Sequence, residues 1–214
     1  MNVNRYLIIG NGAAGVTAAE TIRRRDPAGE ITIVSAEPHP MYSRPGLAYV
    51  LLDVISPKQV IARQPEWYSR QRVELVYGRA VQLDPTRQQV KLDTGKVLAY
   101  DRLLIATGAR ATPPPYAGSE LEGVVYLDTF DGTNELIRLA KKARRAVVIG
   151  GGITALELTE GLAHRGVETH YFVRRDRLWS QVFNNGEAKI LEERMREHGV
   201  IIHYHTEATE ILSD

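Results

Sequence analysis

The sequence predicts an α/β fold that consists of two parallel-sheet units and a small antiparallel β insert. The prediction rests first on a strand, a glycine-rich turn and a helix that follow one another near the start of the chain, an order that recurs from Ala146. Between these stretches, residues 73–100 contain short apolar runs separated by turn residues, a pattern typical of hairpins. Units that open with strand, glycine turn and helix are Rossmann-like.

The first unit opens with an apolar run, Tyr6–Ile9, and a helix is predicted over Ala13–Arg25. Between them Gly10, Gly12 and Gly15 fit the pattern G-x-G-x-x-G. In this pattern the first glycine permits a tight turn, the second lets a pyrophosphate approach the backbone, and the third lets helix and strand pack closely. The free N–H groups at the helix N-terminus attract the anion. The stretch therefore predicts a dinucleotide site.

An acidic residue follows at the spacing expected for ribose binding. The β-branched run Ile31–Val34 leads to Glu37, which lies about 20 residues after Gly15, where an acid can accept a hydrogen bond from a ribose hydroxyl. The loop that follows is rich in proline and therefore extended. It contains Arg44 and Pro45. Arg44 is either a solvated loop arginine or a phosphate ligand. Its place just after the glycine-rich pattern and its acid, which together form a nucleotide-binding fingerprint, favours the role of phosphate ligand.

The middle of the chain is predicted to carry two short helices, at Leu47–Leu52 and within Pro57–Gln71, and then five strands. The predicted strands are Val73–Tyr77, Ala80–Asp84, Gln89–Leu92, Val97–Ala99 and Asp101–Ala106. Consecutive prolines make residues 111–116 a stiff connector. We place a domain boundary there, so that residues 1–115 form the first domain, with the insert at about 73–100, and residues 116–214 form the second.

The second unit repeats the opening pattern. The strand Ala146–Ile149 runs into Gly150 and Gly152, and Ala155 stands at the third glycine position, where the pattern allows alanine. The other predicted elements are helices at Thr133–Lys142, Leu156–His164 and Gly186–His198 and strands at Glu168–Val173 and Val200–Tyr204. Two fingerprints imply two nucleotides, which one chain needs when a flavin and a nicotinamide must meet for hydride transfer.

The second fingerprint lacks the ribose-binding acid. Arg174 lies about 20 residues after Ala155 and is followed by Arg175 and Asp176. Arginine pairs with a 2′-phosphate through its planar guanidinium, so the sequence favours NADPH over NADH. The alternative is a solvated strand end in which Asp176 neutralises one arginine. Glu157, expected in the first turn of the second helix, either balances the helix dipole or faces the nicotinamide.

Composition excludes several functions. The chain has 214 residues, 27 basic and 26 acidic, so its charge gives no argument for nucleic acid. It has no cysteine, which excludes disulfides, thiolate metal sites and thiol catalysis, and no metal site is expected. The apolar runs are too short for a membrane span, and no signal-peptide pattern is present. These features together favour a cytoplasmic protein.

Taken together, these motifs resemble the FAD-dependent pyridine nucleotide-disulfide oxidoreductase superfamily. The matching stretches are Gly10–Gly15, Glu37, Ile105–Gly108 and Val148–Gly152 running to Glu157. The segment Tyr42–Pro45, with Leu47, resembles the cysteine-free branch of ferredoxin/rubredoxin reductases and nitrite-reductase flavin subunits. Members of this superfamily continue further and supply a Gly-Asp motif, which this sequence lacks. The chain therefore resembles an N-terminal portion, with the NAD(P)-binding domain incomplete.

The resemblance implies roles for individual residues. It places Glu157 at the flavin–nicotinamide contact as the catalytic-site residue. FAD would be held by Gly10, Gly12, Ala13, Ala14, Gly15, Glu37, Arg44, Pro45, Ala80, Thr107 and Gly108. NADPH (or NADH) would be held by Gly150, Gly152, Ile153, Thr154, Arg174 and Arg175.

The expected function is a flavoprotein oxidoreductase that passes electrons from NAD(P)H through FAD to an acceptor. The acceptor would be a small ferredoxin- or rubredoxin-type protein or a partner subunit such as nitrite reductase, and a homodimer is one expected assembly. Oxygen or a quinone as acceptor stays open. The alternative from another class is an incomplete nucleotide-binding module without turnover of its own.

Overall fold

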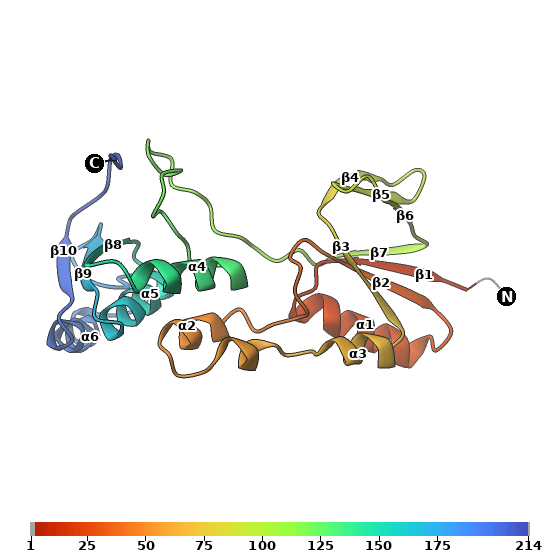
Figure 1. The fold of residues 1–214 in the computed structure, drawn as a ribbon, viewed down its shortest axis with the longest axis horizontal. Coiled ribbons are helices and arrows are strands. Elements are labelled where there is room, and N and C mark those ends of the chain that lie inside the picture. The colour runs from red at the N-terminus through yellow and green to blue at the C-terminus, as the bar shows by residue number, and fades with distance from the viewer. Residues whose placement is uncertain (1–2, 214) are drawn as a thin grey trace. The chain divides into compact units, whose positions relative to one another are not determined.

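The structure is a computed structural model that describes residues 3–213. The chain divides into two compact units, each with its own parallel sheet (Figure 1). The first unit contains the residues up to Ser43 together with Lys58–Ala109. The second contains Arg44–Pro57 together with the residues from Arg110 onward. The predicted fold class, α/β with two Rossmann-like units, is confirmed.

The sheet of the first unit has four parallel strands in the order β3-β2-β1-β7. The strands are β1 (Arg5–Ile9), β2 (Glu30–Ser35), β3 (Val73–Tyr77) and β7 (Arg102–Ile105). Leu7, Ile8 and Ile33 are almost fully buried, as expected for parallel strands that are covered on both faces. The first strand lies inside this sheet, so the glycine turn that follows it emerges between two neighbouring strand ends.

Two different layers cover the two faces of this sheet. Helices α1 (Ala13–Arg25) and α3 (Pro65–Arg70) cover one face, where Val16 packs in one cluster with Ile8. An antiparallel sheet contributes to the core on the other face, where Val90 packs in one cluster with Leu7. Its strands are β4 (Ala80–Asp84), β5 (Gln89–Leu92) and β6 (Val97–Ala99). The insert thus begins at β4 rather than at residue 73, because β3 pairs with β2 in the parallel sheet.

The second unit has three parallel strands in the order β10-β9-β8. They are β8 (Arg145–Ile149), β9 (Glu168–Val173) and β10 (Ile201–Tyr204). Its longer helices are α4 (Phe130–Ala140), α5 (Ile153–His164) and α6 (Asn185–Glu197). One core contains Tyr171 of β9, Leu162 of α5 and Met195 of α6. The strand and helix order around Gly150 is therefore the one that the repeated pattern predicts.

Helix ends explain the small differences from the predicted bounds. Helix α4 begins three residues earlier than expected, because Thr129 caps it by accepting a hydrogen bond from the Gly132 N–H. Helix α6 begins with a capping box in which the side chains of Asn184 and Glu187 each bond the other's backbone N–H. Helix α5 begins at Ile153, directly after the glycine turn.

A short segment of the N-terminal half belongs to the second unit. It contains helix α2 (Gly46–Leu51) and runs to the 3₁₀ turn at Pro57–Val60. A Cβ added at Gly161 of α5 would lie 2.5 Å from Leu51 Cγ, so only glycine admits this helix. Arg165 then donates hydrogen bonds to the carbonyls of Leu51 and Val50, at 2.6 and 3.0 Å. Across residues 3–213, no helix has the length and apolar character needed to cross a membrane.

Candidate nucleotide sites

The first glycine turn is held by close backbone packing. Gly10 has a φ of +119°, and a Cβ there would lie 2.1 Å from the carbonyl oxygen of Ala106. A Cβ at Gly15 would lie 2.0 Å from the carbonyl oxygen of Gly10. Gly12 differs, since nothing lies within 4 Å of the position of its Cβ. Two of the glycines are thus required by packing, and the middle one leaves the backbone open to a ligand.

The N-terminus of α1 is suited to an anion. Ala13 and Ala14 are exposed, Gly12 is the N-cap without a side-chain bond, and no acidic residue stands in the first turn. The first N–H groups of a helix have no partner inside the helix and carry a partial positive charge. A pyrophosphate could therefore approach Gly12 without meeting a side chain or a negative charge.

Glu37 lies just past the end of β2 in the same unit. Its Oε2 accepts a hydrogen bond of 2.6 Å from the hydroxyl of Tyr42. Ser35 Oγ donates to the Glu37 carbonyl at 2.8 Å, which holds the turn after β2. The carboxylate is half-buried and oriented by the tyrosine, which suits a fixed hydrogen-bond acceptor. Tyr42 was not predicted as a site residue.

The turn residue Asn11 is also fixed. Its amide nitrogen donates to the His39 carbonyl at 3.2 Å, and its oxygen accepts from the Tyr68 hydroxyl at 2.8 Å. The same hydroxyl accepts from the Met41 N–H, and burial raises the pKa of Tyr68. These bonds tie the turn to the loop before Tyr42. Neither Asn11 nor Tyr68 was predicted, because their pairing joins segments far apart in the sequence.

The remaining predicted residues of the first unit lie near strand ends or at the insert. Thr107 and Gly108 are exposed just past β7, and Gly108 has a φ of +65°. They follow Ala106, whose backbone packs against Gly10. Ala80 is half-buried at the start of β4, beside an irregularity in its pairing with β5. That these residues hold FAD stays a prediction.

Arg44 and Pro45 belong to the second unit. Arg44 Nη1 donates to the Asp128 carbonyl and lies 3.3 Å from Asp128 Oδ1. Asp128 Oδ2 also accepts from the Ala111 N–H at 3.0 Å, so the arginine and the connector share one carboxylate. Pro45 is the N-cap of α2. A phosphate ligand at Arg44 stays a prediction.

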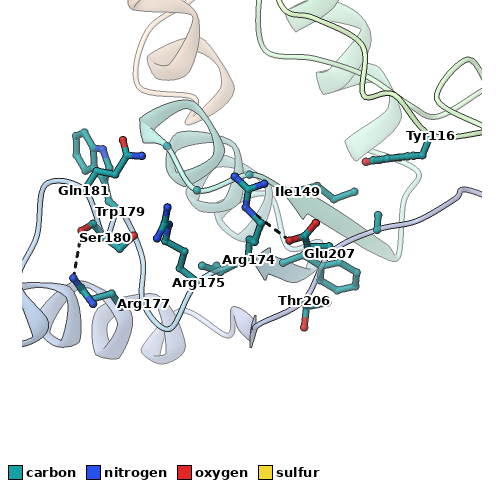
Figure 2. Close-up of a pocket in the computed structure, with 16 residues that line it drawn as sticks. Tyr116, Ile149, Arg174, Arg175, Arg177, Trp179, Ser180, Gln181, Thr206 and Glu207 are labelled. Carbon is teal, nitrogen blue, oxygen red and sulfur yellow. Dashed lines mark hydrogen bonds and ion pairs between the residues drawn. The ribbon is translucent and has the colours of Figure 1, made fainter.

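The second glycine turn opens into a cavity of about 380 Å³ (Figure 2). Of the predicted residues, it brings together Gly150, Gly152, Arg174 and Arg175. Ile153 and Thr154 are exposed in the first turn of α5 and do not line it. The lining residues that were not predicted include Tyr116, Trp179, Ser180, Gln181, Thr206 and Glu207.

This second turn is less crowded than the first. Gly150 has a φ of +150°, and a Cβ there would lie 3.0 Å from the Cβ of Ala155. The methyl group of Ala155 is buried against the turn, which explains why alanine is accepted at the third position. Gly152 faces open space, as Gly12 does. The backbone of the second turn is therefore accessible from the cavity.

The charges around the cavity are arranged in pairs. Arg174 Nε lies 3.8 Å from the carboxylate of Glu207, and both side chains are mostly exposed. Asp176 pairs instead with Arg177, at 3.1 Å. Arg177 also donates to the carbonyls of Ser180 and Phe183, which closes the loop after β9. Glu207, rather than Asp176, is thus the acid beside Arg174.

Glu157 was expected in the first turn of its helix, but the structure places it beyond that turn. Because α5 begins at Ile153, Glu157 is its fifth residue, and the first turn holds no acid. It therefore cannot be the dipole partner of that turn. Burial, with a smaller contribution from Glu160, raises the pKa of Glu157. The residue does not line the cavity, and its predicted role at a nicotinamide stays a prediction.

A signal for the missed residues did exist. In parallel α/β sheets, ligands bind beyond the carboxyl ends of the strands. Thr206 and Glu207 follow β10, and the loop Arg174–Asn184 follows β9. Applying this rule to every strand end would have included them.

In residues 3–213, no group of three histidine, aspartate or glutamate side chains is placed to hold a metal ion.

Two parallel-sheet units, each opened by a glycine turn, define the class of double Rossmann-like proteins. The chain belongs to the pyridine nucleotide-disulphide oxidoreductase family, whose model matches residues 4–214. The resemblance found in the sequence is therefore confirmed.

Two known proteins show what the chain is similar to in sequence. The ferredoxin reductase component of chlorobenzene dioxygenase from Cupriavidus sp. (strain PS12) is 33% identical over 194 residues, which are 90% of this chain and 47% of the relative. The assimilatory nitrate reductase electron transfer subunit of Bacillus subtilis (strain 168) is 30% identical over 202 residues, 94% of this chain and 26% of the relative. This chain thus spans about half, or less, of the length of these relatives.

The fold of the chain is also similar to that of a solved ferredoxin reductase. The ferredoxin reductase for the CYP199A2 system from Rhodopseudomonas palustris superposes with a TM-score of 0.91 at 28% identity. The superposition covers 99% of this chain and 52% of that one. The similarity therefore extends over both units.

Proposed function

We propose that the chain forms the FAD- and NADPH-binding part of a flavoprotein oxidoreductase that delivers electrons to another protein. When bound, FAD supplies the redox chemistry by taking a hydride from the nicotinamide and releasing electrons to an acceptor. One observation carries the proposal: the chain has two glycine turns, each with an open middle position, and the second faces a cavity bordered by arginines. The family to which the chain belongs binds FAD and NAD(P)H.

The first unit is proposed to hold FAD. Open space at Gly12 and the exposed first turn of α1 suit a pyrophosphate. Glu37, oriented by Tyr42, would accept from a ribose hydroxyl. We further propose contributions from Ala80, Thr107 and Gly108 of the same unit, as the family resemblance implies. A role for Arg44 and Pro45, which belong to the second unit, is proposed from that resemblance alone.

The second unit is proposed to hold NADPH in preference to NADH. Gly152 leaves the N-terminus of α5 open, and Ile153 and Thr154 supply N–H groups of its first turn. Arg174 and Arg175 border the cavity where a 2′-phosphate would pair with a guanidinium. Glu157, whose pKa is raised by burial, is proposed to orient the nicotinamide carboxamide.

The proposed acceptor is a small redox protein or a partner subunit. Two similar proteins are named as ferredoxin reductases, and another is an electron transfer subunit of a nitrate reductase. None of the three names specifies a disulfide substrate, and the sequence of this chain contains no cysteine. A homodimer is a further proposal.

Substitution of the two open glycines tests the proposal. The variants Gly12→Val and Gly152→Val should both fold, because neither added Cβ meets an atom within 4 Å and both residues have negative φ. The protein incubated with FAD should show a flavin absorbance band that NADPH bleaches under nitrogen. We expect Gly12→Val to lose the band, and Gly152→Val to keep the band and lose the bleaching. A wild-type protein that binds neither FAD nor NADPH would refute the proposal.

The second candidate is a nucleotide-binding module without turnover. The observation in its favour is that the open glycines and the cavity would serve nucleotide binding alone. In that case the protein would stay colourless with FAD and still bind adenosine 2′,5′-bisphosphate in a calorimeter. A bleachable flavin band would exclude this candidate.

A further inference from the structure

Glu207 reaches the cavity from a strand that the two fingerprints do not include. It lies just beyond the end of β10, next to Thr206. Two backbone hydrogen bonds hold this segment beside the end of β9. The His205 N–H donates to the Arg175 carbonyl at 3.3 Å, and the Thr206 N–H donates to the Val173 carbonyl at 3.2 Å. The position of Glu207 is thus fixed by the extension of one strand along another.

This position places an acid beside the arginine that is proposed to bind the 2′-phosphate. Arg174 Nε and Glu207 Oε1 are 3.8 Å apart, and the two side chains point toward one another in Figure 2. Their side chains are 72% and 62% exposed, so solvent weakens the attraction between them. The pair can therefore open when a stronger anion arrives.

Asp176, which lies close to Arg174 in the sequence, does not compete in this way. Asp176 is held by Arg177, which is also bonded to two loop carbonyls. The carboxylate beside Arg174 is therefore that of Glu207. A 2′-phosphate carries a charge of about −1.5 to −2 at neutral pH, so it both competes with Glu207 for Arg174 and is repelled by it.

From this geometry we infer that Glu207 is a specificity-determining residue that lowers the preference of the site for NADPH over NADH. The inference rests on the proposed function, because it assumes that the cavity binds a pyridine nucleotide. Its carboxylate occupies Arg174 when no 2′-phosphate is present, and a nucleotide without that phosphate leaves the ion pair intact. Only the phosphorylated nucleotide has to displace Glu207.

The test compares two ligands that differ only in the 2′-phosphate. Adenosine 2′,5′-bisphosphate and 5′-AMP are titrated into the whole chain by calorimetry at low ionic strength. Glu207→Gln should bind the bisphosphate about fivefold more tightly, since an exposed ion pair is worth up to about that factor, and 5′-AMP should change by less than about twofold. Glu210→Gln is the matched control, because it removes the same charge from an exposed residue of the same segment outside the cavity lining.

A double-mutant cycle separates competition from general charge. In an Arg174→Gln background, Glu207→Gln should have a clearly smaller effect on the bisphosphate. Equal changes for both ligands, no change for either, or an equal effect of Glu210→Gln would overturn the role of Glu207. Wild-type protein that binds neither ligand would overturn the nucleotide site itself and this inference with it, so the two failures are distinguishable.

Discussion

The two glycine turns of the chain share a sequence pattern but differ in how tightly they are packed. In the first turn, a methyl group at Gly15 would come within 2.0 Å of a carbonyl oxygen. In the second, the equivalent position is Ala155, and its methyl group is accommodated. The middle glycines, Gly12 and Gly152, both face open space. The open middle position is thus alike in the two turns, and the third position, which packs against the turn, is not.

The turns also differ in the charge beyond the next strand. Glu37 follows β2 in the first unit, and Arg174 follows β9 in the second. An acid suits a ribose hydroxyl and a guanidinium suits a phosphate. The two strand ends thus carry opposite charges next to turns of the same pattern. Four predictions test how far this contrast extends.

The largest effect is expected from exchanging the third positions. Gly15→Ala should lower the free energy of unfolding by about 3 kcal/mol, because the new methyl group overlaps backbone atoms that cannot move aside. Ala155→Gly should cost only about 1 kcal/mol, the usual penalty for glycine in a helix. Urea unfolding followed by circular dichroism measures both. Equal losses in the two variants would remove the contrast in packing.

The next effect concerns the arginine at the end of β9. Arg174→Gln should weaken binding of adenosine 2′,5′-bisphosphate by about 2 kcal/mol, the typical value of a hydrogen bond to a charged group, and should leave 5′-AMP nearly unchanged. Arg24→Gln, an exposed arginine on α1, is the control for charge alone. Calorimetric titration gives the affinities. A loss of the same size for both ligands would show that Arg174 does not contact the 2′-phosphate.

A smaller effect is expected from acid on the first unit. Hydrogen bonds from the Arg5 side chain, and then from its backbone N–H, lower the pKa of Asp101 to about 2. Because the folded pKa lies below the ordinary value of about 3.9, the stabilisation is present above that pH and is lost as the pH falls through about 2. Arg5→Gln should raise the pKa of Asp101, measured by NMR titration. An unchanged titration would contradict the assignment.

The smallest effect is expected at Glu157 in the second unit, where the pKa is raised, whereas the pKa of Asp101 is lowered. Burial, and then Glu160, raise the pKa of Glu157. Its contribution to stability is therefore full below the ordinary glutamate pKa of about 4.3 and is lost as the pH rises through the raised value. Glu157→Gln should flatten this decline in urea midpoints measured from pH 4 to 8. Glu160→Gln should flatten it only in part, and no difference between wild type and Glu157→Gln would refute the effect.

Much of the fold was predictable because local patterns and tertiary packing agree. The strands β3, β4, β5, β6 and β9 have the predicted bounds. Each contains apolar residues, and β3, β4 and β5 are followed directly by glycine, proline or aspartate, which are typical of turns. Helix α5 was expected to begin at Leu156 and begins at Ile153. The correct start could have been predicted by analogy with the first unit, because helix α1 also starts directly after the second glycine of its turn.

The candidate site was predictable only where it follows a motif. The residues of the second turn and its strand end do line one cavity. Glu207 lines it too and could have been found by applying the strand-end rule to the predicted strand Val200–Tyr204. Tyr116 lines the cavity from the connector, and no local pattern predicts that position. The place of α2 in the second unit was missed for the same reason, because it depends on Leu51 meeting Gly161 more than one hundred residues later.

The segment Arg44–Pro57 belongs to the second unit, and this affects how the two units could be recombined between genes. The chain leaves the first unit after Ser43, returns at Lys58 and leaves it again after Ala109. A recombination break at residue 109 would therefore transfer the first unit with a helix that has lost its neighbours, and Leu51, fully buried here, would face water. Neither unit can be exchanged between genes as one uninterrupted cassette, so the two are expected to be inherited together.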